Sequence, residues 1–123
     1  GQIIGETNLH AALWDNGSYT DLGTLGGSYS WAEDINDGGQ VVGYSSTDTG
    51  NVRATLWDDG EIIKLGNLPG ATGSSMAVAI NNSGLIVGNS NSVATLWNNG
   101  KALDLNSLLD ESLKSAGWIL IYR

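Results

Sequence analysis

The sequence of 123 residues predicts an all-β protein made of three four-stranded units of the propeller-blade type. Eighteen Gly against a single Pro indicate many tight turns between short elements, as in all-β proteins. The string INDGGQVVGYS, which begins at Ile35, returns as INNSGLIVGNS at Ile80. A second string occurs three times, as LWDNG from Leu13, LWDDG from Leu56 and LWNNG from Leu96. The repeating unit is therefore about 40 to 45 residues long, which is typical of a propeller blade.

Each complete unit contains four short strand signals that are separated by turn residues. In the two complete units the first strand is SWAEDIN or SMAVAIN, and the second is QVVGYS or LIVGNS. The third is RATLWD or VATLWN, and the fourth is EIIKL or KALDL. Asp-Gly and Asn-Gly pairs join the third strand to the fourth and favour type I′ hairpins; they are Asn16-Gly17, Asp59-Gly60 and Asn99-Gly100. The first hairpin is expected to close in a similar way, through Asp37-Gly38-Gly39 and Asn82-Ser83-Gly84.

The three units form a single domain, residues 1–123, but the first unit is incomplete. Residues 1–27 lack a first strand, whereas residues 28–71 and 72–116 each contain all four. The segment GWILIYR, residues 117–123, has the apolar pattern of a first strand. We therefore expect it to complete the sheet of residues 1–27, and the side chains expected to close the joint are Trp118, Leu120 and Tyr122.

Three blades are too few for a closed ring, because propellers have roughly four to eight. A three-bladed chain would leave two apolar blade faces and one strand edge in water, and both promote association. The sequence therefore predicts a homodimer that completes a six-bladed β-propeller around a two-fold axis, the commonest symmetry of homo-oligomers. Residues 117–123 of each copy would then most simply pair with residues 1–27 of the other. The alternative is a monomeric β-trefoil, which also has three repeats of this length.

The strings DLGTLGGSYSWAEDINDGGQVVGYS and HAALWDNG resemble the HAF-type extracellular repeat family of bacteria, and the resemblance covers nearly the whole chain. His10-Ala11-Ala12 occupies the place of the motif that names the family. The later copies depart from that motif, with Arg53 and Val93 at the position of His10, and Ala12 stands where the motif has Phe. The resemblance implies a secreted, β-rich repeat protein. The family supplies no catalytic residues that could be carried over to this chain.

The formal net charge of −8 is concentrated near the N-terminal end, where residues 1–37 hold six acids and neither Lys nor Arg. Such a surface repels phosphate groups, so we expect neither nucleic acid nor an anionic membrane as a partner. No apolar run approaches the roughly 18 residues that would cross a bilayer. The chain has no Cys, which excludes disulfides and thiol chemistry.

The tryptophans are the first candidates for a site. Trp14, Trp57 and Trp97 recur once per unit, at the end of the third strand. They have two interpretations: they pack between blades, or they are stacking platforms for a sugar, as in a propeller lectin. Trp31 corresponds to Met76, and Trp118 has no clear counterpart, so neither of these two belongs to a periodic site.

No catalytic constellation is evident in the sequence. His10 is the only histidine, which excludes a histidine cluster for a metal within one chain. Glu33 and Asp34 are adjacent on a predicted strand and so point to opposite faces, the wrong arrangement for an acid–base pair. Whichever of them points inward is expected to line the central channel and to favour a cationic or polar ligand. The acids and amides of the turns lack the spacing of a calcium-binding loop.

The sequence therefore predicts a non-enzymatic extracellular module for binding or scaffolding. No cofactor or metal is expected, and the ligand would be a carbohydrate or a protein. The alternatives are a carbohydrate-binding propeller lectin and a glycan-active enzyme with its site in the channel.

Overall fold

The protein is all-β, as predicted. The structure, a computed structural model, describes residues 2–7 and 9–105, and these form three separate antiparallel sheets. The first sheet contains β1 (Gln2–Thr7), β2 (His10–Asp15) and β3 (Ser18–Asp21). The second contains β4 (Gly26–Ile35), β5 (Val41–Thr47), β6 (Val52–Asp58) and β7 (Glu61–Lys64). The third contains β8 (Ser75–Ile80), β9 (Ile86–Ser90), β10 (Val93–Asn98) and β11 (Lys101–Asp104).

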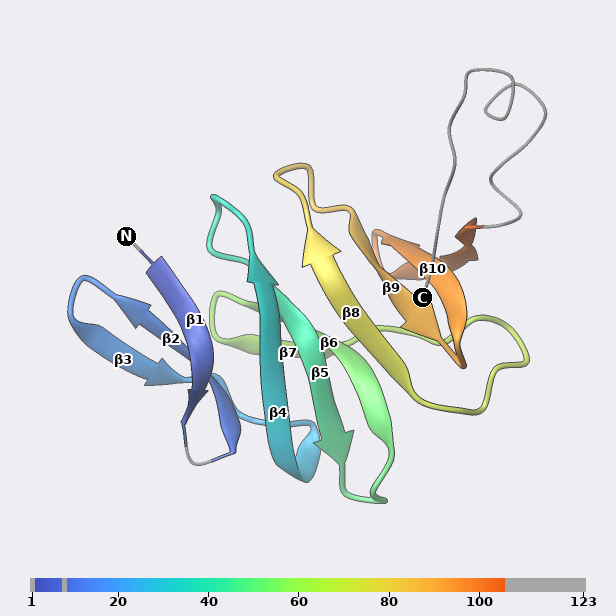
Figure 1. Cartoon of the computed structure of the whole chain (residues 1–123), viewed down its shortest axis with the longest axis horizontal. Coiled ribbons are helices and arrows are strands. Elements are labelled where there is room, and N and C mark those ends of the chain that lie inside the picture. The colour runs from blue at the N-terminus through green and yellow to red at the C-terminus, as the bar shows by residue number, and fades with distance from the viewer. Residues whose placement is uncertain (1, 8, 106–123) are drawn as a thin grey trace.

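The sheets stand side by side in chain order, with the second sheet between the other two (Figure 1). Within each sheet, every strand pairs with the strand next to it in the sequence, so each sheet is a simple meander. In the described part of the chain, no strand pairs with a strand of another sheet. These residues therefore do not form the closed barrel that the β-trefoil alternative needs. They also contain no helix of the length and apolarity required to cross a membrane.

The hairpins between the third and fourth strands have the predicted turns. Asn16, Asp59 and Asn99 have φ angles of 51°, 50° and 53°. The Gly that follows each of them also has a positive φ, between 81° and 85°. Two successive residues with positive φ are the signature of the type I′ turn, whose twist matches that of the flanking strands.

The first hairpin of each complete unit closes differently, so the expectation of a similar turn was wrong. Here only the last residue of the turn, Gly39 or Gly84, has a positive φ. An Asn side chain holds the turn from inside: Asn36 Oδ1 accepts hydrogen bonds from the backbone N–H groups of Gly38 and Gln40. Asn81 Oδ1 accepts the equivalent bonds in the third sheet. In both turns the Asn side chain, rather than a type I′ backbone, therefore satisfies two backbone N–H groups.

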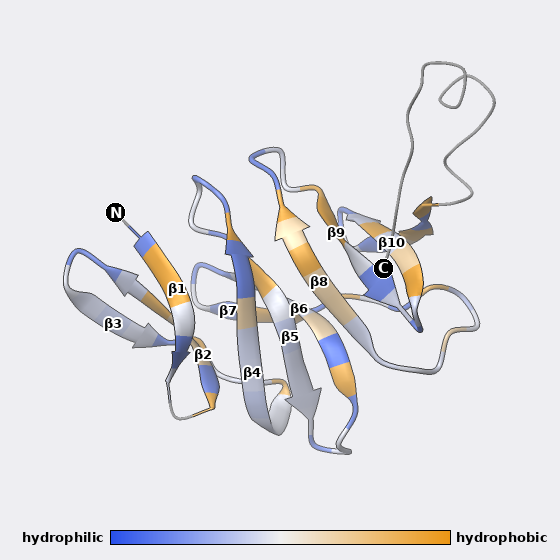
Figure 2. Cartoon of the chain, in the orientation of Figure 1, coloured by the Kyte–Doolittle hydropathy of each residue, from blue (hydrophilic) through white to orange (hydrophobic). Residues whose placement is uncertain are grey.

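The core lies between neighbouring sheets. Ala11 and Ala32 pack with Val41 and Trp57 between the first and second sheets. A larger cluster between the second and third sheets contains Val42, Ala54, Leu65, Ala77, Ile80, Ile86 and Trp97. Val41 and Val42 are consecutive on β5 and so point to opposite faces. The second sheet is therefore buried on both faces, and apolar stretches recur in the strands of all three sheets (Figure 2).

Buried serines fix the distance between neighbouring sheets. Ser30 Oγ of β4 accepts a hydrogen bond of 2.8 Å from the backbone N–H of Ala11 in the first sheet. Ser75 Oγ of β8 accepts the equivalent bond, of 2.9 Å, from Ala54 in the second sheet. The sequence repeat thus gives a repeated contact between sheets. In both interfaces a serine of the later sheet accepts a hydrogen bond from a backbone N–H of the earlier sheet.

Candidate binding surfaces

The three periodic tryptophans occupy equivalent positions but different environments. Trp57 lies buried between the first and second sheets, and Trp97 lies buried between the second and third. Trp14 is only half-buried, and its ring centroid lies 5.7 Å from that of Tyr19. A buried ring offers no face to a sugar. Stacking on a ligand therefore stays a prediction for Trp14 alone, whereas Trp57 and Trp97 occupy packing positions.

The first sheet has an apolar face that no described residue covers. Ile3, Val41 and Ile86 hold the same position in the repeated hairpin. Val41 and Ile86 are 1% and 3% exposed, because the preceding sheet covers them, whereas Ile3 is 66% exposed. Trp14 belongs to the same face as Ile3, since the two are directly paired across β1 and β2. This face is therefore built like a sheet interface, but none of the three described sheets lies against it.

The third sheet has the complementary open face. Val42 and Val87 hold equivalent positions on β5 and β9. Val42 is fully buried against the third sheet, whereas Val87 is 37% exposed. Among the described residues, the first sheet thus presents a face of the kind that receives a sheet, and the third sheet presents a face of the kind that covers one. The residues predicted to close the ring, which are Trp118, Leu120 and Tyr122, lie outside the described residues.

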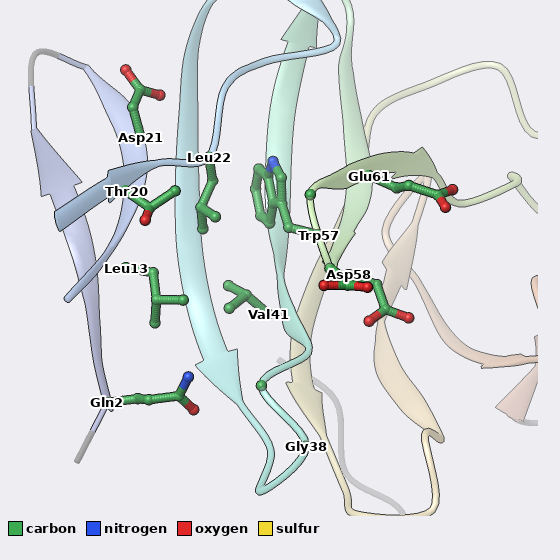
Figure 3. A pocket seen from close by; sticks show the side chains of 13 residues that line it. Gln2, Leu13, Thr20, Asp21, Leu22, Gly38, Val41, Trp57, Asp58 and Glu61 are labelled. Carbon is green, nitrogen blue, oxygen red and sulfur yellow. The ribbon is translucent and has the colours of Figure 1, made fainter. Parts of the chain in front are cut away.

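A cleft opens between each pair of neighbouring sheets. The first is a cavity of about 580 Å³ on which Leu13, Leu22, Val41 and Trp57 converge (Figure 3). Carboxylates also line it, but Glu61 points away from the cavity in this view. The second cleft, of about 440 Å³, has an equivalent lining in which the amides Asn98 and Asn99 replace Asp58 and Asp59, and Gly100 corresponds to Gly60. The clefts are therefore a consequence of stacking equivalent sheets.

The two adjacent acids of β4 have different roles. Asp34 Oδ2 accepts a hydrogen bond of 2.9 Å from the backbone N–H of Ile80 in β8, so Asp34 joins the second sheet to the third. Glu33 is the extra residue of a β-bulge between Ala32 and Asp34, and it is exposed. Of the pair, Glu33 is thus the acid that remains open to a ligand.

Glu33 interacts electrostatically with a second acid, Glu6, and with Tyr44. Burial, followed by the charge of Glu6, raises the pKa of Glu33 above its ordinary 4.5. Burial also raises the pKa of Tyr44, and the nearby Glu33, Tyr29 and Glu6 raise it further. Trp31 is the direct cross-strand neighbour of Tyr44, and such pairs point to the same face of a sheet. Trp31 does not recur in the repeat, so the sequence alone did not indicate this grouping.

The raised pKa of Glu33 predicts a pH-dependent effect of the Glu33→Gln substitution. The folded chain holds the Glu33 proton more tightly than the unfolded chain, so the ionised side chain costs stability at neutral pH. This cost disappears as the pH falls below the ordinary value of 4.5. We expect Glu33→Gln to raise the free energy of unfolding at about pH 7 by less than about 1 kcal/mol, since the group is largely exposed. Urea unfolding at about pH 3.5 should show no gain, and a gain of equal size at both pH values would contradict the explanation.

The described residues show no catalytic arrangement around the histidine. His10 Nδ1 lies 3.0 Å from a carboxylate oxygen of Asp21, in a partly exposed pair on neighbouring strands. Within the same residues there is no group of three or more His, Cys, Asp or Glu side chains that could hold a metal ion. The pair tethers the end of β2 to β3, which is a structural role.

Comparisons with known proteins found no matching family model, no matching curated protein and no matching solved structure. The likeness to HAF-type repeats therefore stays a prediction from the motifs.

Proposed function

We propose that the chain is a non-enzymatic binding or scaffolding module in which the three sheets are propeller blades and two copies close a six-bladed ring. The observation that carries the proposal is the exposure of Ile3, at a position that is buried in both other sheets. Apolar side chains built for an interface but left in water favour association. An extracellular location belongs to the same proposal and rests on the resemblance to HAF-type repeats.

The two open faces are complementary within the chain's own repeat. The face of the second sheet that carries Val42 covers Ile86 and Trp97 of the third sheet. The open face of the third sheet, which carries Val87, is the equivalent of that covering face. It is therefore suited to cover Ile3 and Trp14 of a second copy. Two such joints are related by a two-fold axis and close a ring of six blades, a size within the range of propellers.

Ring closure also suggests a partner for residues 117–123. The first sheet has only three described strands, and β1 is its inner edge strand, whereas β4 and β8 occupy that edge in the other sheets. We infer that residues 117–123 pair with β1, most simply in the partner copy, and so supply the missing fourth strand. Closure of a ring by a strand from the opposite end of the chain protects an edge that would otherwise pair at random.

Three matched substitutions test the assembly. Ile3→Glu and Val87→Glu place a charge on one or the other open face, and each is expected to give a monomer in sedimentation velocity. Val78→Glu is the control, because Val78 is also an exposed valine of the third sheet but lies in the β8 bulge that corresponds to Glu33. It should leave the mass unchanged. If all three variants keep the mass of the parent chain, the open faces are not the contact surfaces.

A further inference from the structure

A cluster of exposed and half-buried aromatic and acidic side chains lies on β4, β5 and β1. Trp31 is 43% exposed, and Tyr29, two residues earlier on β4, is also exposed. Tyr44 lies beside Trp31 on the neighbouring strand, and Glu33 follows in the bulge. Glu6 of β1 acts electrostatically on both Glu33 and Tyr44. We call these five residues the β4 patch.

The β4 patch is not required by the repeat. The third sheet has Met76, Val78 and Asn89 at the positions of Trp31, Glu33 and Tyr44. The third sheet nevertheless forms the same strands, the same bulge and the same kind of interface without these aromatic and acidic groups. The aromatic rings and the acid of the second sheet are thus departures from a pattern that folds without them.

The acids of the β4 patch have no cationic partner among the described residues. Neither Glu6 nor Glu33 forms an ion pair there, and their side chains make no hydrogen bond. Arg53 of β6, which pairs with Ser45 next to Tyr44, donates hydrogen bonds to the carbonyl oxygens of Val52 and Gly73. The two carboxylates repel each other, and partial burial adds to the cost of their charges. A positive ligand would offset the repulsion between the two carboxylates.

We propose that the β4 patch binds an alkylated ammonium group, with the rings of Trp31, Tyr29 and Tyr44 as cation–π partners and the carboxylates of Glu33 and Glu6 as counter-charges. Cations bind over the faces of Trp and Tyr, and aromatic sites of this type recognise quaternary ammonium ions. The proposal deepens the proposed function, since it gives the binding module a ligand class. All five residues belong to one chain, so the site does not depend on the dimer.

The positive charge distinguishes the proposed ligand from a sugar. A sugar ring would also stack on Trp31, and its hydroxyl groups can donate hydrogen bonds to the two carboxylates, but a neutral molecule does not offset their charge. A neutral molecule of the same shape as the cation should likewise bind weakly, because it keeps the apolar contact and loses the electrostatic attraction. The contrast between the cation and its neutral isostere is therefore the decisive comparison.

The experiment is a calorimetric titration of the full chain with choline chloride, 3,3-dimethyl-1-butanol and a methyl glucoside. The alcohol has the shape of choline with carbon in place of the charged nitrogen. We expect choline to bind at least about tenfold more tightly than the other two compounds. Equal affinity for choline and the alcohol, or tighter binding of the glucoside, would overturn the proposal, as would no binding of choline.

Variants locate the binding and separate it from assembly. Trp31→Ala and Glu33→Gln should each weaken choline binding about tenfold. The matched control is Glu61→Gln, which removes an exposed acid of β7 and should leave the affinity unchanged. The monomeric variant Ile3→Glu should bind choline as the parent does, so failure of the dimer and failure of the ligand site are distinguishable. Unchanged affinity in both Trp31→Ala and Glu33→Gln would show that choline binds elsewhere and would refute the site.

Discussion

Replacing Trp97 by alanine is expected to lower the free energy of unfolding by about 4 kcal/mol. The Trp97 ring is fully buried between the second and third sheets, and its Nε1–H donates a hydrogen bond of 2.6 Å to the carbonyl oxygen of Gly66. The substitution leaves a cavity as large as an indole and an unpaired carbonyl. Urea unfolding monitored by circular dichroism measures the loss.

A comparison of two phenylalanine variants separates the hydrogen bond from the packing. At Trp57 the equivalent carbonyl, that of Gly23, accepts a bond from Ser30 Oγ, and the buried Trp57 Nε1 has no partner among the described residues. Trp57→Phe removes an unsatisfied donor, whereas Trp97→Phe breaks a bond. We expect Trp97→Phe to cost about 1 kcal/mol more than Trp57→Phe. Equal costs would show that the indole of Trp97 contributes through its volume alone.

The second large effect is expected at two equivalent glycines. A Cβ at Gly43 would overlap the carbonyl oxygen of Trp31, and a Cβ at Gly88 would overlap that of Met76. Each glycine lies opposite the inner strand of its own sheet, where the bulge brings the two backbones together. A rigid backbone cannot move aside as a side chain can. We therefore expect Gly43→Ala and Gly88→Ala each to cost about 3 kcal/mol or more in urea unfolding.

Gly5→Ala uses the same position in the first sheet to test for the missing strand. Among the described residues, the nearest atom to a Cβ at Gly5 is a ring carbon of the Trp14 side chain, 3.1 Å away, and not a backbone atom. If β1 had no inner partner, the substitution would cost little. With residues 117–123 paired to β1 we expect a loss similar to that of Gly43→Ala. A loss well below that of Gly43→Ala would contradict the proposed pairing.

The sequence was sufficient to predict the sheets and the tight turns between their third and fourth strands. Asn16-Gly17 and its two counterparts specify a local conformation through their own backbone preferences, so the prediction needed no tertiary information. The prediction for the turn after Asn36 was wrong. Asp37-Gly38 suggested a turn like those between the third and fourth strands, whereas the Asn36 side chain accepts the hydrogen bonds of the observed turn. A turn can therefore be predicted from the sequence where the backbone preferences of its own residues determine its conformation.

The environments of equivalent residues could not be predicted from the repeat. Trp14 and Trp57 stand in nearly identical strings, yet within residues 2–7 and 9–105 a neighbouring sheet covers the ring of Trp57 and not that of Trp14. The difference in burial depends on the position of each unit among the stacked sheets. The sequence of a single unit carries no information about that position. The β4 patch could be predicted in part, because Trp31 and Glu33 depart from the repeat. Their grouping with Glu6, however, depends on the packing of the first sheet against the second, which the sequence does not show.

The most direct test of the closed ring is the solution mass of the unmodified chain. Sedimentation equilibrium at micromolar concentration should give twice the chain mass of 12.8 kDa. A single compact species of 12.8 kDa would contradict it, because the faces that carry Ile3 and Val87 would then remain in water.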